Sequence, residues 1–182
     1  MCGINGIYQF SKRTFSEDKI KAMNQASAHR GPDAEGEYID DHIMLGHRRL
    51  SIIDPVEASN QPFFSPDGRF VLVFNGEIYN YQEVRSQIDD YTFVTNGDTE
   101  VVLAAYRRFG SNCLRMFNGM FAFAIWDKEK KELFVARDRL GIKPLYYYRS
   151  DEEFLFSSSI NPVTSIFLFL SSVISCCFVI PI

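Results

Sequence analysis

Short apolar runs and stretches of helical spacing alternate along the first part of the chain. Residues 4–10 form an apolar run typical of a strand. Ser16 is placed to cap a helix over residues 17–28, in which Ile20 and Met23 share one face. The pattern therefore predicts a strand followed by an amphipathic helix.

A hairpin and a buried strand are predicted next. Residues 35–39 and 43–50 flank a pair of aspartates, which is typical of a hairpin. The segment RFVLVFNGEIYNY is apolar almost without interruption until Asn75 and Gly76, which predicts a buried strand that ends there. Asn80 is placed to cap a short helix that follows it.

One more helix and four more strands complete the predicted domain. Thr99 is placed to cap an apolar helix over residues 100–109, which Gly110 ends. The runs GMFAFAIWD, ELFVARD, KPLYYYR and EFLFSSS are separated by short polar turns, which predicts an antiparallel meander. Strands at both ends with helices between them favour a layered α+β domain over alternating βαβ units.

The C-terminal segment differs in kind from the rest of the chain. No charged residue follows Glu153, and residues 166–180 read IFLFLSSVISCCFVI. This run is shorter than the roughly 20 residues of a membrane helix and has no flanking Lys or Arg. Three interpretations stay open: an added core strand, a non-native sequence after a truncation or frameshift, and a tail anchor in a membrane. The short length and the missing Lys and Arg make the tail anchor the less favoured of the three.

Composition limits the partners and the compartment. With 182 residues, of which 46% are hydrophobic, the chain suits one globular domain and a tail. A net charge of -4 provides no broad basic surface, so we expect a small ligand and no nucleic acid. The four cysteines, Cys2, Cys113, Cys176 and Cys177, have no CxxC spacing, so neither a metal site nor a disulfide framework is predicted. Because no signal peptide is evident either, we expect a cytoplasmic protein.

Cys2 is the first candidate for chemistry. Removal of Met1 would place a thiol and an α-amine on the same residue. Their ordinary pKa values are about 8.5 and about 7.7–8.0, so the amine could take the proton of the thiol. The alternative is that a small apolar cysteine simply begins a strand.

Asn75 and Gly76 could supply hydrogen-bond donors to a developing oxyanion. An Asn-Gly pair is also the commonest type I′ turn dipeptide, so a hairpin turn is the alternative.

Charged candidates come from three separate segments. Arg49, at the end of an apolar strand, could bind a carboxylate with two hydrogen bonds, and Glu77 and Asp98 could meet an ammonium group. Surface ion pairing is the alternative for each. His29 and Asp33 are expected to order a loop, Asp138 and Arg139 to form an ion pair at a corner, and the three histidines are too scattered for a metal site.

Seven segments together resemble one family. They are Cys2 at the N-terminus, HRGPD, RLSIID, FNGEIYN, NGDTEVVL, GMFAFAIWD and RDRLGIKPLYY. In order and spacing they resemble the glutaminase domain of glutamine-dependent asparagine synthetase, over about residues 2–160. The resemblance implies an N-terminal nucleophile hydrolase fold, a four-layer αββα sandwich of two antiparallel sheets flanked by helices.

The resemblance also implies a reaction, in which glutamine is hydrolysed to glutamate and ammonia through a thioester. Cys2 is similar to the nucleophile and its free amine to the general base, while Asn75 and Gly76 match the oxyanion hole. The residues implied in binding L-glutamine are Arg49 for the α-carboxylate, the backbone of Leu50, Ser51, Ile52 and Ile53, and Glu77 and Asp98 for the α-amino group.

Members of the resembled family continue into a second domain. That synthetase domain, or a separate synthetase subunit, binds ATP and magnesium and receives the ammonia, so no cofactor is expected within residues 1–182. We predict a glutaminase domain over residues 2–160 and an apolar tail over residues 161–182 that is not family sequence. The resemblance also implies a homodimer. An inactive or regulatory remnant of the fold and a tail-anchored membrane protein remain as alternatives.

Overall fold

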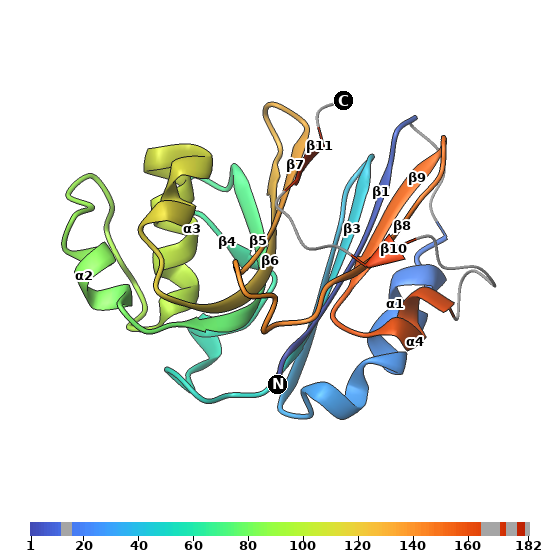
Figure 1. The fold of residues 1–182 in the computed structure, drawn as a ribbon, viewed down its shortest axis with the longest axis horizontal. Coiled ribbons are helices and arrows are strands. Elements are labelled where there is room, and N and C mark those ends of the chain that lie inside the picture. Colours follow the sequence, from blue (N-terminus) through green and yellow to red (C-terminus); the bar gives the residue numbers. More distant parts are fainter. Residues whose placement is uncertain (12–15, 165–171, 174–177, 181–182) are drawn as a thin grey trace.

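Two antiparallel sheets lie face to face at the centre of the computed structural model, which describes residues 1–11, 16–164, 172–173 and 178–180 (Figure 1). The first sheet contains, in spatial order, β10 (Ser172–Val173), β8 (Tyr146–Arg149), β9 (Glu153–Ser157), β1 (Gly3–Gln9), β3 (Ile43–Arg49) and β2 (Ala34–Ile39). The second contains β11 (Phe178–Ile180), β7 (Glu132–Arg137), β6 (Gly119–Asp127), β5 (Phe70–Ile78) and β4 (Phe63–Phe64).

Helices cover the outer face of each sheet. Helices α1 (Asp18–Ala26) and α4 (Ile160–Thr164) lie on the first sheet, and α3 (Asp98–Phe109) lies on the second, with α2 (Tyr81–Arg85) packed against α3 (Figure 1). The layers therefore follow the order α, β, β, α, which confirms the predicted α+β architecture. Short 3-10 helices also connect these elements in the described part of the chain: η1 (Ala28–Arg30), η2 (Glu57–Ser59) and η3 (Gly110–Arg115).

Strand β5 is buried on both faces, which explains its nearly continuous apolar sequence. Val71 and Val73 point into the core between the sheets, whereas Leu72 and Phe74 pack in the core beneath α3. The pleat of the strand sends alternate side chains to opposite faces. A residue at the end of β5 is thus held between two packed layers.

The predicted meander is wrong. β6 pairs with β7 in the second sheet, whereas β8 pairs with β9 in the first, so the chain crosses between the sheets after β7. At this crossing the Asp138 carboxylate accepts backbone N–H groups of Phe121, Ile142 and Lys143. The predicted ion pair with Arg139 is absent from the described residues, since Arg139 donates to the Leu114 carbonyl. Sequence alone cannot reveal that the partners of Asp138 are backbone amides.

The predicted helix caps also differ from the structure. Helix α3 begins at Asp98 with Gly97 as its N-cap, so Thr99 lies inside the helix. The Asn80 side chain joins Met116 and Asn118 instead of capping α2. Ser16 donates to the Asp18 side chain and caps no backbone N–H.

The tail contributes two short strands to the edges of the sheets. β10 pairs with β8 and β11 pairs with β7, both antiparallel, which agrees with the interpretation of added strands. Residues 165–171, 174–177 and 181–182 lie outside the described part of the chain, and the boundary at residue 160 stays a prediction. No helix in the described part is both long and apolar enough to cross a membrane.

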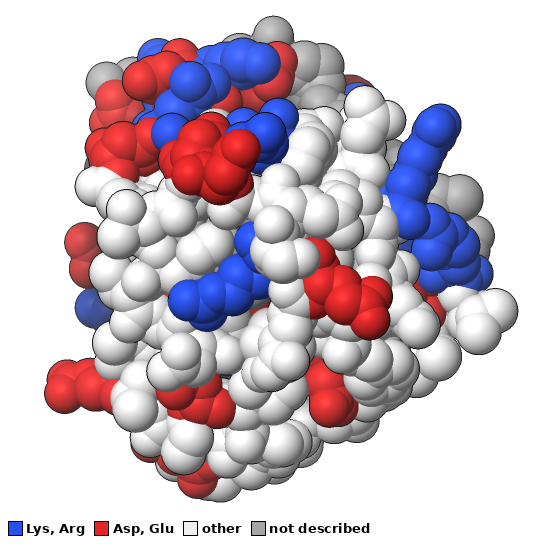
Figure 2. Space-filling model, turned by 90° about the vertical axis from the view of Figure 1, so that its left-hand side faces the viewer, with Lys and Arg blue, Asp and Glu red and all other residues white. Residues whose placement is uncertain are grey.

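Charged side chains of both signs gather at one end of the outer face that carries α2 and α3 (Figure 2, top). Arg69 pairs there with Asp127 and Glu129, while Arg108 pairs with Asp89 and Asp90. Acidic and basic groups alternate, so this end of the face offers no patch of a single sign.

A cluster of buried polar side chains anchors the start of β1 to α1. The Asn5 amide donates to Asn24 Oδ1 at 2.9 Å, and its oxygen accepts the hydroxyls of Ser157 and Ser27 at 2.7 and 3.3 Å. Asn5, Ser27 and Ser157 are fully buried, and Asn24 almost so. Groups buried in this way need partners, because an unpaired one loses its hydrogen bonds to water without replacement.

We expect Asn5→Leu to lower the free energy of unfolding by about 1–3 kcal/mol, because the hydroxyl protons of Ser27 and Ser157 and the Asn24 amide oxygen each lose the hydrogen bond to Asn5. Urea unfolding followed by circular dichroism measures the change. Asn112→Leu, at an exposed position of η3, is the matched control and should leave the midpoint nearly unchanged. An equal midpoint for Asn5→Leu and wild type would contradict the role of the cluster.

Candidate active site

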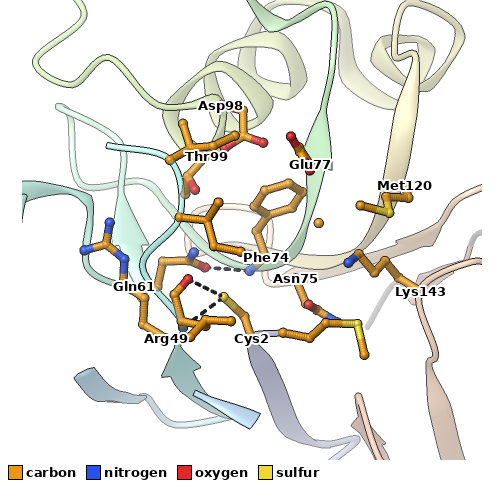
Figure 3. A pocket seen from close by; sticks show the side chains of 15 residues that line it. Cys2, Arg49, Gln61, Phe74, Asn75, Glu77, Asp98, Thr99, Met120 and Lys143 are labelled. Atoms are coloured by element: carbon orange, nitrogen blue, oxygen red, sulfur yellow. Dashed lines mark hydrogen bonds between the residues drawn. The ribbon is translucent and has the colours of Figure 1, made fainter. Parts of the chain in front are cut away.

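A cavity opens where the start of β1, the end of β3 and the last residues of β5 meet (Figure 3). Its volume of about 100 Å³ is below the roughly 300–1,000 Å³ of sites for drug-sized ligands, so it suits a ligand of amino-acid size. Of the residues predicted to form the site, those that line it are Cys2, Arg49, Leu50, Ile52, Ile53, Asn75, Gly76, Glu77 and Asp98.

The Cys2 side chain lies against the backbone that follows β3. Its Sγ atom is 3.4 Å from the Leu50 nitrogen, which donates to it, and 3.6 Å from the Leu50 oxygen, which accepts the thiol proton (Figure 3). Arg30 Nε donates to the Cys2 carbonyl oxygen at 3.0 Å. The thiol and the main chain of Cys2 are therefore both held in place, and Met1 lines the cavity beside them.

Arg49 is the last residue of β3 and is 6% exposed. Its Nη1 donates to the Val56 carbonyl at 2.8 Å and to Asn60 Oδ1 at 2.7 Å, and its Nη2 donates to the Asp54 carbonyl at 2.7 Å. The guanidinium points away from Cys2, toward the loop of residues 54–60 that carries these three acceptors (Figure 3). Three of its five N–H donors hold the loop in place, and all three acceptors are uncharged.

Ser51 does not line the cavity, unlike the other residues of the segment from Leu50 to Ile53. Its backbone nitrogen donates to Asp33 Oδ2 at 2.7 Å, so the segment is tied to the HRGPD loop. For Asp33 the prediction of a loop-ordering residue near the site is confirmed.

Asn75 and Gly76 lie within β5, so the alternative of a hairpin turn is wrong. They pair with Ala122 and Phe121 of β6, and the strand continues to Ile78. Asn75 is 1% exposed, and its Nδ2 donates to Ser158 Oγ at 3.4 Å. An amide nitrogen carries two N–H donors, so one remains for another acceptor.

The Gly76 N–H lies on the edge of β5 that faces away from β6. Along this edge the Phe74 nitrogen donates to Gln61 Oε1 at 2.6 Å and the Ile78 nitrogen to Asp98 Oδ2 at 3.0 Å. Because strand residues alternate between edges, the N–H of Gly76, midway between these two, also faces this edge. Among the described residues it has no partner, and Gly76 lines the cavity. A Cβ at this position would stand 2.6 Å from the Met120 oxygen, so the site requires glycine.

Asp98 and Glu77 place two carboxylates on the same side of the cavity (Figure 3). Asp98 is 4% exposed and begins α3. Burial raises the pKa of Asp98 to about 6, and the negative charge of Glu77 contributes to the rise, against backbone hydrogen bonds that lower it. A cation bound between the two carboxylates would relieve both effects.

Several lining residues are absent from the predicted set. Gln61, Phe74, Thr99, Met120 and Lys143 line the cavity, and Lys143 is only 7% exposed. Lys143 faces the cavity from the crossing between the sheets (Figure 3). Its place in the segment RDRLGIKPLYY was a signal, but no local pattern shows that this loop reaches a cavity formed by β1, β3 and β5.

No metal site accompanies the cavity in the described part of the chain, where no group of three or more His, Cys, Asp or Glu side chains could hold a metal ion. His47 is fully buried behind β5, with Nε2 3.2 Å from the Phe74 oxygen. Burial lowers the pKa of His47 to about 3, so the ring is neutral.

Residues 1–172 match the profile of the glutamine amidotransferase domain. The chain belongs to this family. It is 45% identical to asparagine synthetase [glutamine-hydrolyzing] 1 of Bacillus subtilis strain 168, over 87% of the chain and 26% of that protein. It is 44% identical to amidase chry2 of Gibberella zeae, over 79% of the chain and 22% of that protein.

The fold of this amidotransferase domain has a close structural counterpart. Glutamine phosphoribosylpyrophosphate amidotransferase of B. subtilis superimposes with a TM-score of 0.80 at 20% identity, over 99% of this chain and 47% of that one. The N-terminal nucleophile hydrolase fold is therefore confirmed. The chain spans about a fifth to a third of the length of the curated asparagine synthetases that it matches.

Asp98 makes stability depend on pH with a definite sign. Its pKa is about 6 in the folded protein and 3.8 when unperturbed, so the folded state binds the proton more tightly, and stability falls as pH rises through this window. Asp98→Asn removes the titration and can still accept the Ile78 N–H. We expect its free energy of unfolding, relative to wild type, to rise by about 2–3 kcal/mol between about pH 4 and pH 8, since one pKa unit is about 1.4 kcal/mol.

Urea unfolding at several pH values tests this expectation. Asp151→Asn, at an exposed aspartate away from the cavity, is the control and should follow wild type at each pH. A pH-independent difference between Asp98→Asn and wild type would show that Asp98 does not titrate in this window.

Proposed function

We propose that this domain hydrolyses L-glutamine to glutamate and ammonia through a thioester on Cys2. The observation that supports this most is that Cys2 Sγ, the unpaired N–H of Gly76 and the carboxylates of Glu77 and Asp98 all line one cavity of amino-acid size. The family match and the relatives named as glutamine-hydrolysing support the same substrate.

The Cys2 thiolate attacks the side-chain carbonyl carbon of glutamine, and the carbonyl electron pair moves onto oxygen. The freed α-amine of Cys2 takes the thiol proton and returns it to the leaving nitrogen, so that ammonia departs and a glutamyl thioester remains. Water then attacks the thioester, which releases glutamate and restores the thiol. Met1 must be absent for this step, because in its presence the nitrogen of Cys2 is an amide.

Asn75 and Gly76 stabilise the oxyanion of each tetrahedral intermediate. The free N–H of the Asn75 amide and the backbone N–H of Gly76 both belong to a strand fixed between two packed layers. Donors that are fixed before the charge develops cost no reorganisation in the transition state.

Arg49 and the two carboxylates recognise the amino-acid part of the substrate. Two N–H donors of the Arg49 guanidinium are not used by the loop of residues 54–60, and these bind the α-carboxylate. Glu77 and Asp98 bind the α-ammonium group. Backbone groups of the segment from Leu50 to Ile53 complete the contact.

The ammonia passes to an ATP-dependent synthetase domain or subunit, which supplies the ATP and magnesium of the overall reaction. The relatives named asparagine synthetase, which are longer than this chain, favour asparagine as the product. Amidase chry2, which is 44% identical over most of the chain, is not named a synthetase, so similarity of this domain by itself does not assign the acceptor.

We expect Cys2→Ala to abolish glutamate release, with a loss of at least about 10³-fold in kcat, because no other thiol lines the cavity in the described part of the chain. Intact mass first establishes whether Met1 has been removed, and glutamate is then measured with excess glutamine. Cys113→Ala changes the other cysteine of the described part, which is buried in η3 and does not line the cavity, and this variant should retain activity. Undiminished glutamate release by Cys2→Ala would refute the nucleophile.

The proposal also gives kcat/KM for glutamine a limb near pH 6. Only ionised Asp98 attracts the α-ammonium group, and its pKa in the free domain is about 6, so kcat/KM should fall as pH drops through this value. In Asp98→Asn this limb should disappear, and KM should be raised at neutral pH. An unchanged acid limb in the variant would assign the titration to a different group; Asp151→Asn serves as the control.

A further inference from the structure

We propose that Gln61 and His47 are positioning residues for the oxyanion-binding donors of Asn75 and Gly76, because their side chains replace a missing strand beside β5. The inference rests on the proposed function. It concerns two residues that have no contact role in the proposed substrate binding.

The strand β4 ends just short of the place where β5 reaches the cavity. β4 pairs only Phe63 with Leu72 and Phe64 with Val71. If this register continued, residue 61 would stand opposite Phe74, but the ladder stops there. Instead the Gln61 side chain accepts the Phe74 N–H at 2.6 Å, which is shorter than most N–H···O bonds.

His47, on β3 of the first sheet, contacts the other polar group of Phe74. Its Nε2 is 3.2 Å from the Phe74 carbonyl oxygen. A carbonyl can only accept, so Nε2 carries the proton and donates. Nδ1 is buried and has no hydrogen-bond partner in the described part of the chain, which leaves the contact with Phe74 as the polar function of this ring.

Together the two side chains fix both polar groups of Phe74. The Phe74 carbonyl belongs to the peptide unit that also contains the Asn75 nitrogen, so its direction sets the start of Asn75 and Gly76. β6 holds the other side of this unit through the pairing of Asn75 with Ala122, whereas on the edge that faces the cavity no strand of the described part pairs with Phe74, and Gln61 and His47 supply the contacts there. Misplacement of reacting or stabilising groups by as little as about 1 Å can cost about 100-fold in rate.

A positioning role predicts a loss in kcat alone. Gln61→Met keeps the length of the side chain and removes the acceptor, and we expect kcat for glutamine to fall by about 10- to 100-fold with KM little changed. Alkylation of Cys2 by iodoacetamide requires the thiolate but forms no oxyanion, so its rate should match wild type. Gln82→Met, at an exposed position of α2, is the matched control for glutamine replacement.

A pair of variants tests His47 independently. His47→Leu removes the donor and should lower kcat as Gln61→Met does. His47→Gln offers an amide N–H close to the position of Nε2, and should restore most of kcat. Thermal unfolding measured on each variant identifies any that is not folded, and Gln61→Met decides the matter if His47→Leu does not fold.

The results separate this inference from the proposed function. If wild type releases no glutamate in a Cys2-dependent manner, the proposed function fails. If wild type is active but Gln61→Met and His47→Leu retain its kcat, the positioning role is overturned. It is also overturned if the fall in kcat in these variants comes with a change in KM and in the rate of Cys2 alkylation.

Discussion

Beyond the two residues at which β4 pairs with it, strand β5 has a neighbouring strand along one edge only. Backbone N–H groups on an unpaired edge need partners, and here they meet side chains: Gln61 at Phe74 and Asp98 at Ile78. Gly76, between them, retains its free N–H. Because no strand in the described part of the chain pairs with this stretch of the edge, the Gly76 N–H is free to donate, the cavity lies beside it, and the Ile78 N–H bonds to the buried Asp98.

The charges around the cavity are held by neutral partners. Arg49 donates to two carbonyls and an amide oxygen, and Asp98 accepts a backbone N–H. These contacts fix the direction of each side chain without cancelling its charge. The raised pKa of Asp98 reflects this, because burial and Glu77 act on a carboxylate that has no cationic partner among the described residues. Such a site keeps its electrostatic attraction for an ionic ligand.

Much of the fold follows from the sequence, and the site follows from it less completely. Apolar periodicity located β1, β3, β5 and α3, since each buries a continuous face. The same pattern could not show that β7 and β8 belong to different sheets, because both are short apolar runs separated by a polar turn. Local statistics favoured a turn at Asn75 and Gly76, and tertiary pairing with β6 overrides them. The sequence did not identify Gln61 and Lys143 as lining residues. The position of Gln61 depends on where β4 stops, and that of Lys143 on where the chain crosses between the sheets.

The position of Met1 connects the chemistry to processing of the chain. Met1 lines the cavity and is 55% exposed, so the bond that joins it to Cys2 lies at the mouth of the site. The Cys2 side chain and carbonyl are held by Leu50 and Arg30, contacts that do not involve Met1. Removal of Met1 would therefore leave the thiol in place, enlarge the cavity and convert an amide nitrogen into a base next to that thiol. In the mechanism proposed above, the geometry of the site is built before Met1 is removed, and only the proton acceptor depends on that removal.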